Sequence, residues 1–143
     1  MHTLKQILDL KAIDDVWSVA PDTTVFEAIQ VMAEKRVGAL LVMDGEALKG
    51  IVSERDYARE VILKGRLSKQ TLVGEIMSSK VISAPSTHSV TASLGLMTDH
   101  QFRHLPVVDD GVVVGVVSIG DLVKDVISDQ QSTIEQLENY IRT

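Results

Sequence analysis

The sequence predicts an α/β fold made from one structural unit that occurs twice, and three observations carry that prediction. First, Thr24–Ile62 and Ser89–Ile127 align at an offset of 65 residues with eleven identical positions. Second, each copy contains the motif Gly-h-h-Ser-x-x-Asp, where h is aliphatic, beginning at Gly50 and at Gly115. Third, the runs of valine, isoleucine and leucine before each motif serine have the composition of buried strands.

The first copy is predicted to contain helix, strand, strand and helix in that order. A capping box from Thr24 to Glu27 begins the first helix, and Gly38 is expected to end it. An Asp-Gly turn joins the two strands. Ser53 begins the second helix, because its hydroxyl can accept from first-turn amides, and Gly65 ends it. The predicted elements are helices over 24–38 and 53–65 and strands over 39–43 and 48–52.

The second copy repeats this pattern, and Val112–Val117 is its last strand. Five valines interrupted only by Gly115 predict a strand that is buried on both faces. Ser118 is expected to begin the following helix. Two copies are too few for a solenoid, so we expect the two units to pack about a pseudo-twofold axis.

Two apolar stripes lie outside the repeat and predict amphipathic helices. The C-terminal stripe follows a polar Asp-Gln-Gln-Ser break, so it is expected to form a separate helix. Each stripe either packs on its own domain or forms a dimer contact. The stripes are Leu4, Ile7 and Leu8 near the N-terminus and Ile134, Leu137 and Ile141 near the C-terminus. The predicted organisation is an N-terminal helix over 1–15, repeats over 16–65 and 81–130, a connector over 66–80 with one helical turn, and a C-terminal helix over 131–143.

Composition limits the partners and the compartment. The net charge of -6 argues against nucleic acid, whose phosphates select basic surfaces. No apolar run approaches the roughly 20 residues that span a bilayer, and the opening segment lacks the features of a signal peptide. The chain has no cysteine, which fits a reducing compartment. We therefore expect a cytoplasmic protein that binds neither nucleic acid nor membrane.

Each Ser-x-x-Asp motif has two interpretations. Ser53 with Asp56, and Ser118 with Asp121, match a capping box, in which the acid accepts from the serine amide and needs no ligand. Alternatively, the helix start binds phosphate through its free amides, and the aspartate accepts both hydroxyls of a ribose. For an isolated motif the capping interpretation is the better one, whereas the duplication favours ligand binding.

Basic residues near the motifs are candidates for phosphate contacts. Arg103 and His104 precede a strand in an otherwise acidic chain, and Arg55 lies inside the first motif. His100 and His104 cross from a helix end to a strand, so a shared metal ion is not expected. Ser118, His104 and Asp121 lack the Gly-x-Ser-x-Gly elbow of a hydrolase, so we expect no enzyme activity.

Taken with Leu105-Pro106-Val107-Val108-Asp109 and Ser83-Ala84-Pro85, the doubled motif resembles a tandem pair of CBS (cystathionine-β-synthase) domains over about Val16–Ile127. The resemblance implies two β-α-β-β-α repeats about a pseudo-twofold axis, usually dimerised. It further implies clefts between the repeats that bind AMP, ATP, NAD or S-adenosylmethionine, with the serine facing phosphate and the aspartate holding ribose. No other cofactor is expected.

The two copies depart differently from the family pattern. Leu41 stands where the second copy keeps Pro106, and Gly38-Ala39 stands where the second copy has Arg103-His104. The two clefts are therefore expected to differ, with the weaker cleft relying on the first copy.

The resulting hypothesis is a stand-alone sensor module, a homodimer that binds AMP, ADP, ATP or NAD and signals to a downstream protein by a conformational change. The alternative is a structural or protein-interaction scaffold without a physiological ligand. The expected ligand-binding residues are Val16, Ser18, Gly38, Ala39, Ser53, Arg55, Asp56, Val81, Ser83, Arg103, His104, Leu105, Pro106, Ser118, Gly120 and Asp121.

Overall fold

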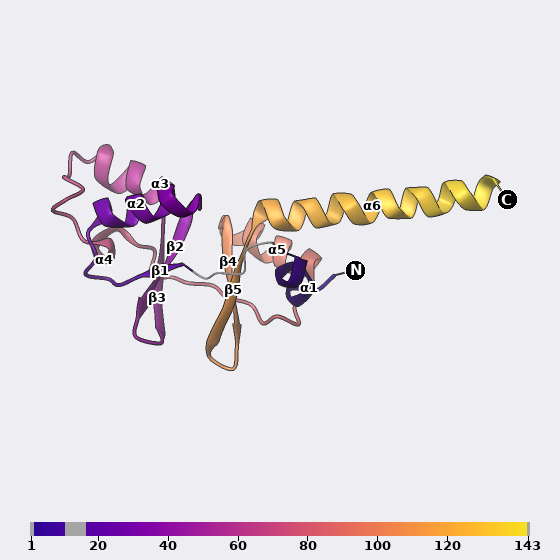
Figure 1. Cartoon of the computed structure of the whole chain (residues 1–143), viewed down its shortest axis with the longest axis horizontal. Helices are drawn as coiled ribbons and strands as arrows, with labels where there is room; N and C mark the ends of the chain where they lie inside the picture. Colours follow the sequence, from indigo (N-terminus) through magenta and orange to yellow (C-terminus); the bar gives the residue numbers. More distant parts are fainter. Residues whose placement is uncertain (1, 11–16, 143) are drawn as a thin grey trace. The chain divides into compact units, whose positions relative to one another are not determined.

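The computed structural model describes residues 2–10 and 17–142 and divides into two compact units (Figure 1). One unit is Val16–Val81, and the other joins Met1–Asp15 to Ile82–Thr143. Each unit holds one copy of the repeat, and the residue numbers of corresponding hairpin strands differ by 65 at both ends. Helices and small sheets are mixed in both units, so the predicted α/β fold class is confirmed.

The unit that holds the first copy contains a three-stranded sheet in the order β1-β2-β3. The two-residue strand β1 pairs parallel with β2, and β2 pairs antiparallel with β3. Buried aliphatic side chains and Met32 from the helices and strands form its core. The elements are β1 (Ser18–Val19), α2 (Val25–Lys35), β2 (Ala39–Asp44), β3 (Ala47–Ser53), α3 (Glu54–Tyr57), the π-helix η1 (Ala58–Ile62) and α4 (Val73–Ile76), which supplies the helical turn predicted in the connector.

The unit that holds the second copy is built around the β4–β5 hairpin. A parallel bridge between Ala84 and Val107 takes the place of β1. Both hairpins shift register at equivalent points, after Val42 and after Val107, so the duplication extends to the β-bulge. The elements are α1 (Leu4–Leu10), α5 (Val90–His100), β4 (His104–Asp109), β5 (Val112–Ser118) and α6 (Ile119–Arg142).

Helices α2 and α5 begin as predicted but end differently. The hydroxyls of Thr24 and Ser89 accept from the amides three residues later, which caps both helices. Helix α2 then ends at Lys35 rather than at Gly38, because Arg36 adopts a left-handed conformation with φ of 57°. Gln101 ends α5 in the same way with φ of 59°. The expected glycine stop at Gly38 is therefore wrong.

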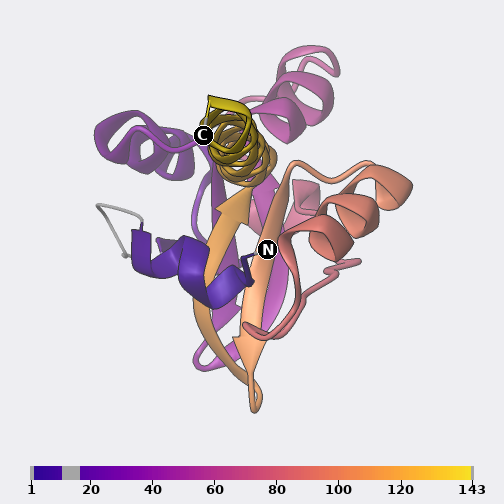
Figure 2. The same ribbon diagram turned by 90° about the vertical axis from the view of Figure 1, so that its right-hand side faces the viewer.

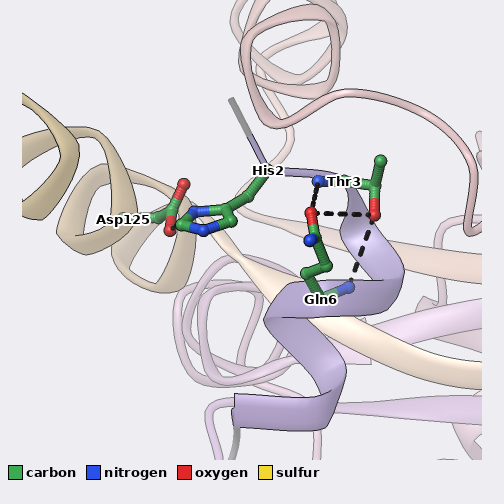
Figure 3. Close-up of polar contacts among 4 residues, drawn as sticks. All are labelled: His2, Thr3, Gln6 and Asp125. Carbon is green, nitrogen blue, oxygen red and sulfur yellow. Dashed lines mark hydrogen bonds and ion pairs between the residues drawn. The ribbon is translucent and has the colours of Figure 1, made fainter.

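The N-terminal stripe packs on the unit of the second copy. Leu4, Ile7 and Leu8 are at most 9% exposed and belong to its core. The His2 ring nitrogen Nδ1 lies 2.5 Å from Asp125 Oδ1 on α6, and Gln6 Oε1 accepts from the Thr3 amide at 2.9 Å (Figure 3). Of the two interpretations left open for this stripe, packing on its own domain is confirmed.

Helix α6 is one continuous helix of 24 residues, so the predicted break after Ser128 is wrong. Aspartate, glutamine and serine cost only a few tenths of a kcal/mol each in a helix, which is too little to stop one that is already nucleated. Only Leu122 of this helix is fully buried. From Ile127 to Arg142 the helix is exposed, and its C-terminal part extends away from α5 and the hairpin of its own unit in Figure 1. Figure 2 looks along the same helix from its C-terminal end.

Strand β5 is fully buried on only one face, and only in its second half. Gly115 and Val117 are buried on one face, Val116 on the other face is half-buried, and Val112 and Val114 are 62% and 43% exposed. The prediction of a strand buried on both faces is therefore wrong, and the first half is exposed because the hairpin projects beyond the helices that cover its base.

Candidate helix-start sites in the two CBS-like copies

In each copy, the start of the first hairpin strand is fixed against the start of the following helix. Ala39 pairs with Ser53 across the β2–β3 hairpin, and His104 pairs with Ser118 across β4–β5. The carbonyl of the preceding residue then accepts from the first helical amide. Glu54 N–H donates to the Gly38 carbonyl at 3.1 Å in the first copy.

The second copy repeats this contact with Ile119 N–H donating to the Arg103 carbonyl at 2.9 Å. One orphan amide of each helix start is thereby satisfied by the residue before the strand. The positions that differ most between the copies, Gly38 and Arg103, thus have the same backbone role. Their side chains set the chemical difference between the two sites.

The serine and aspartate of the first motif form a complete capping box. Asp56 Oδ2 accepts from the Ser53 amide at 2.9 Å and from the Ser53 hydroxyl at 3.0 Å. In return, the Asp56 amide donates to Ser53 Oγ at 3.2 Å. Both residues are half-buried, so this carboxylate lies near the surface of its unit.

The second motif has the same arrangement at the start of a much longer helix. Asp121 Oδ2 accepts from the Ser118 amide at 2.8 Å, and the Asp121 amide donates to Ser118 Oγ at 3.1 Å. Ser118 and Asp121 are also half-buried. The capping interpretation of both motifs is therefore confirmed, and any ligand role comes in addition to it.

One first-turn amide remains for a ligand in each copy. The first amide is bonded to the strand-start carbonyl and the third to the serine hydroxyl. The second amide belongs to Arg55 in the first copy and Gly120 in the second, and both residues are exposed. Within residues 2–10 and 17–142, neither of these two amides has a protein acceptor. The helix starts therefore offer fewer free donors than the motif alone suggested.

The basic side chains give the two helix starts different character. Arg103 is exposed, and His104 is half-buried as the first residue of β4. The equivalent residues of the first copy, Gly38 and Ala39, are half-buried and carry no charge. Arg55 is exposed in the first turn of α3. The second copy therefore has positive charge on the strand side, whereas the first has it on the helix side.

Some of the predicted ligand-binding residues are buried, and others are exposed. Leu105 is 1% exposed and belongs to the core, so only its backbone could face a ligand. Pro106 is buried, and its carbonyl accepts from the Ala84 amide at 3.1 Å. Ser18 and Ser83 are exposed at equivalent positions beside β2 and β4, and Val81 is half-buried. Val16 lies outside the described residues.

The predicted residues divide between the two units, and in each unit the strand-start residue pairs with the motif serine. The site that both copies would share stays a prediction. The unit of the first copy holds Ser18, Gly38, Ala39, Ser53, Arg55, Asp56 and Val81, and the unit of the second holds Ser83, Arg103, His104, Leu105, Pro106, Ser118, Gly120 and Asp121.

Sequence reasoning missed Trp17, which borders the first site. Its carbonyl accepts from the Leu41 amide at 3.1 Å, next to the pairing of Ser18 with Leu41. Lys35 Nζ lies 4.4 Å from the centroid of the half-buried Trp17 ring. The only signal in the sequence was that the single tryptophan directly precedes Ser18.

The described part of the chain lacks two features, a metal-binding cluster and a membrane-spanning helix. It contains no group of three or more His, Cys, Asp or Glu side chains placed to hold a metal ion. Likewise, among the residues described, no helix combines the length and the apolar character that crossing a bilayer requires.

Comparisons with known proteins agree with the duplicated architecture. The sequence profile of the CBS domain matches twice, over residues 5–63 and 73–128. The chain is 40% identical over 138 residues to the mitochondrial CBS domain-containing protein CBSX3 of Arabidopsis thaliana, covering 92% of this chain and 67% of that protein. That relative is therefore about one and a half times as long as this chain.

Solved structures share the fold. A protein with CBS domains from Burkholderia ambifaria, named as a candidate signal-transduction protein, is 50% identical with a TM-score of 0.86, covering 90% of this chain and 96% of the other. The CBS domain pair of protein MJ0100 was solved in complex with 5′-methylthioadenosine and S-adenosyl-L-methionine. It is 23% identical with a TM-score of 0.78, covering 90% of this chain and 98% of the other, and shows the shared fold.

Proposed function

Because the chain belongs to the CBS domain family, with two CBS domains in tandem, we propose that it is a regulatory module that binds an adenosine-containing nucleotide between them. The observation that carries the proposal is the repeated helix start. Both copies hold a Ser-x-x-Asp motif against a strand start, at the surface of their units. AMP, ADP, ATP and NAD are the proposed ligands, since each offers a phosphate for the helix start and a ribose for the aspartate.

The second copy is the stronger proposed site. The exposed Gly120 amide and the Arg103 guanidinium would face phosphate. The guanidinium is positively charged, and the amide lies at the positive end of the helix dipole. Asp121 would accept from the ribose hydroxyls. The methylthioadenosine and S-adenosyl-L-methionine in the related domain pair support adenosine as the shared part of the ligand.

Regulation requires more than binding. A nucleotide shifts a conformational equilibrium only by the difference between its affinities for the two states. We propose that this shift changes the affinity for a downstream protein and that the chain itself is not an enzyme. A homodimer in the cytoplasm is the proposed working form, although one relative carries a mitochondrial name.

A structural scaffold is the second candidate, and one observation favours it. Both capping boxes are complete without a ligand, so the motifs already have a stabilising role. In this alternative the repeats present surfaces to protein partners, and nucleotides do not raise the stability of the chain.

Calorimetric titration of the full chain with AMP, ADP, ATP and NAD tests the proposal. We expect one of them to bind, and Asp121→Ala to weaken binding by about 1.5–3 kcal/mol, the value of a hydrogen bond to a charged group. Asp99→Ala removes the same charge from an exposed position at the end of α5 and should leave the affinity unchanged. Equal affinity for wild type and Asp121→Ala rejects the ribose role, and no binding of any nucleotide favours the scaffold.

A further inference from the structure

Helix α6 carries an exposed apolar seam with heptad spacing. The five apolar residues of this seam are between 41% and 81% exposed, and successive seam positions are four and three residues apart in alternation. This is the a/d spacing of a coiled coil, and it is sustained over three heptads. The α6 seam consists of Val123, Ile127, Gln130, Ile134, Leu137 and Ile141.

The seam is distinct from the face that α6 presents to its own unit. Leu122 is fully buried, and Ile119 and Val126 pack against the same core. From Ile127 to Arg142 every residue of the helix is exposed. Isolated helices of about this length are marginal in water, so the outer part of α6 needs a surface that covers its apolar side.

The charge of α6 indicates which kind of surface can cover the α6 seam. The helix has five acidic and only two basic side chains. An acidic polar face is repelled by anionic lipid headgroups and by nucleic-acid phosphates, both of which select basic helices. The seam therefore fits the apolar surface of a protein.

The residue types in the α6 seam favour pairing with an identical helix. Ile127, Ile134 and Ile141 occupy the a positions, and Leu137 occupies a d position. Isoleucine at a with leucine at d favours parallel coiled coils of two strands. Lys124 and Glu138 occupy e positions at the edge of the seam, and no charged residue occupies an a or d position. Two copies can therefore approach along the seam without burying charge in its centre.

We infer that the α6 seam binds the α6 seam of a second copy of this chain, as a parallel, in-register, two-stranded coiled coil. In this arrangement each Gln130 faces its counterpart, and the two side-chain amides can pair. The antiparallel alignment would instead place Gln130 against Ile134 and leave the amide without a partner. The α6 contact gives the proposed homodimer its contact surface. It rests on the homodimer of the proposed function but not on nucleotide binding.

Sedimentation equilibrium of the full chain at micromolar concentration tests the contact. Wild type should sediment with twice the 15.6 kDa mass of one chain. The double variant Ile134→Asp, Leu137→Asp should raise the dissociation constant of the dimer by about 100-fold, because it buries four charges in the paired seam. Both residues are more than half exposed, so the unit itself should stay folded by circular dichroism.

The matched control places the same substitutions on the other side of α6. Ser132→Asp with Gln136→Asp adds two aspartates to the same stretch at positions outside the seam. We expect this variant to remain dimeric. If the seam variant stays dimeric, the α6 contact is wrong but the homodimer stands. If the wild type is monomeric, both the α6 contact and the homodimer are wrong. Nucleotide binding is tested separately by the calorimetric titration.

The orientation is tested by cross-linking, which the absence of cysteine makes simple. Ile141→Cys should form a disulfide-linked dimer on mild oxidation if the helices are parallel and in register. In the antiparallel alignment Ile141 faces Val123, and the two introduced thiols lie about 27 Å apart at 1.5 Å per residue. A dimer that does not cross-link through residue 141 overturns the parallel arrangement.

Discussion

Ser118 and Asp121 hold one another at the first turn of α6, each accepting a hydrogen bond from the backbone amide of the other. The amide of Ser118 donates to the Asp121 carboxylate at 2.8 Å, and the amide of Asp121 donates to the Ser118 hydroxyl at 3.1 Å. Ser53 and Asp56 form the same pair in the other unit. These pairs fix the helix starts at which we propose that a ligand binds.

Ser118→Ala should lower the free energy of unfolding by about 0.5–2 kcal/mol, the usual cost of losing an N-cap hydroxyl. The amide of Asp121 would lose its acceptor at a half-buried position. Urea denaturation followed by circular dichroism measures the change. Ser128→Ala, at an exposed position inside α6, is the control and should be neutral or slightly stabilising. Equal effects of the two changes would contradict a capping role for Ser118.

The two motif glycines should differ in their tolerance of alanine. A Cβ at Gly50 would lie 2.7 Å from the Ser78 carbonyl oxygen, which cannot move freely because it accepts from the Ile51 amide. A Cβ at Gly115 would meet Leu8 Cδ2 at 2.6 Å, at the end of a side chain that can rotate. We expect Gly50→Ala to cost about 1–3 kcal/mol and Gly115→Ala less, by urea denaturation.

Gly95→Ala is the control for both glycine substitutions. Apart from the neighbouring backbone of α5 itself, no atom lies within 4 Å of the added Cβ. Gly95 is inside α5, so alanine should stabilise the helix by about 0.5–1 kcal/mol. If Gly115→Ala proved more damaging than Gly50→Ala, the distinction between a fixed carbonyl and a rotatable side chain would be wrong.

The helix starts were predictable from sequence because their determinants are local. Ser53 and Asp56 are three residues apart, so the cap needs no distant contact, and the motif alone predicts it. The strands and the N-terminal helix were predictable for a similar reason, since hydrophobic periodicity reports directly on burial.

Features that depend on weak or distant determinants were not predictable. Arg36 ends α2 in a left-handed conformation that arginine disfavours intrinsically, so no residue preference indicated it. The polar segment after Ser128 contains only mild helix formers, and continuity with the first turns of α6 decides its state. The carbonyl contacts of Gly38 and Arg103 join residues sixteen positions apart, which no local pattern encodes.

Asp109 should make stability depend on pH. The Ser86 hydroxyl donates to Asp109 Oδ2 at 2.6 Å and the Ser86 amide to Oδ1 at 2.9 Å. The hydroxyl contact first, then the amide contact, lowers the pKa of Asp109 from its ordinary value of 3.8. A carboxyl with a lowered pKa in the folded state stabilises the protein above pH 3.8, and this contribution is lost as the pH falls through the lower value.

Ser86→Ala removes the hydroxyl donor and should bring the pKa of Asp109 back toward 3.8, as a carbon-13 titration of the carboxyl group would show. Wild type should be more stable than the variant at pH 7, and the difference should shrink as the pH falls below 3.8. Thr87→Ala, at the exposed neighbouring position, is the control and should leave the titration of Asp109 unchanged. A stability difference that grows on acidification would contradict this assignment.

The left-handed residue at the end of α2 offers a route to a more stable protein. Arg36 has φ of 57° and is exposed, so glycine there removes the steric cost of that conformation without losing packing. Part of the gain is offset because glycine raises the entropy of the unfolded chain. We expect Arg36→Gly to raise the free energy of unfolding by up to about 1 kcal/mol by urea denaturation. Lys35→Gly, one residue earlier and still helical, should instead cost about 1 kcal/mol, and the same sign for both changes would contradict the argument.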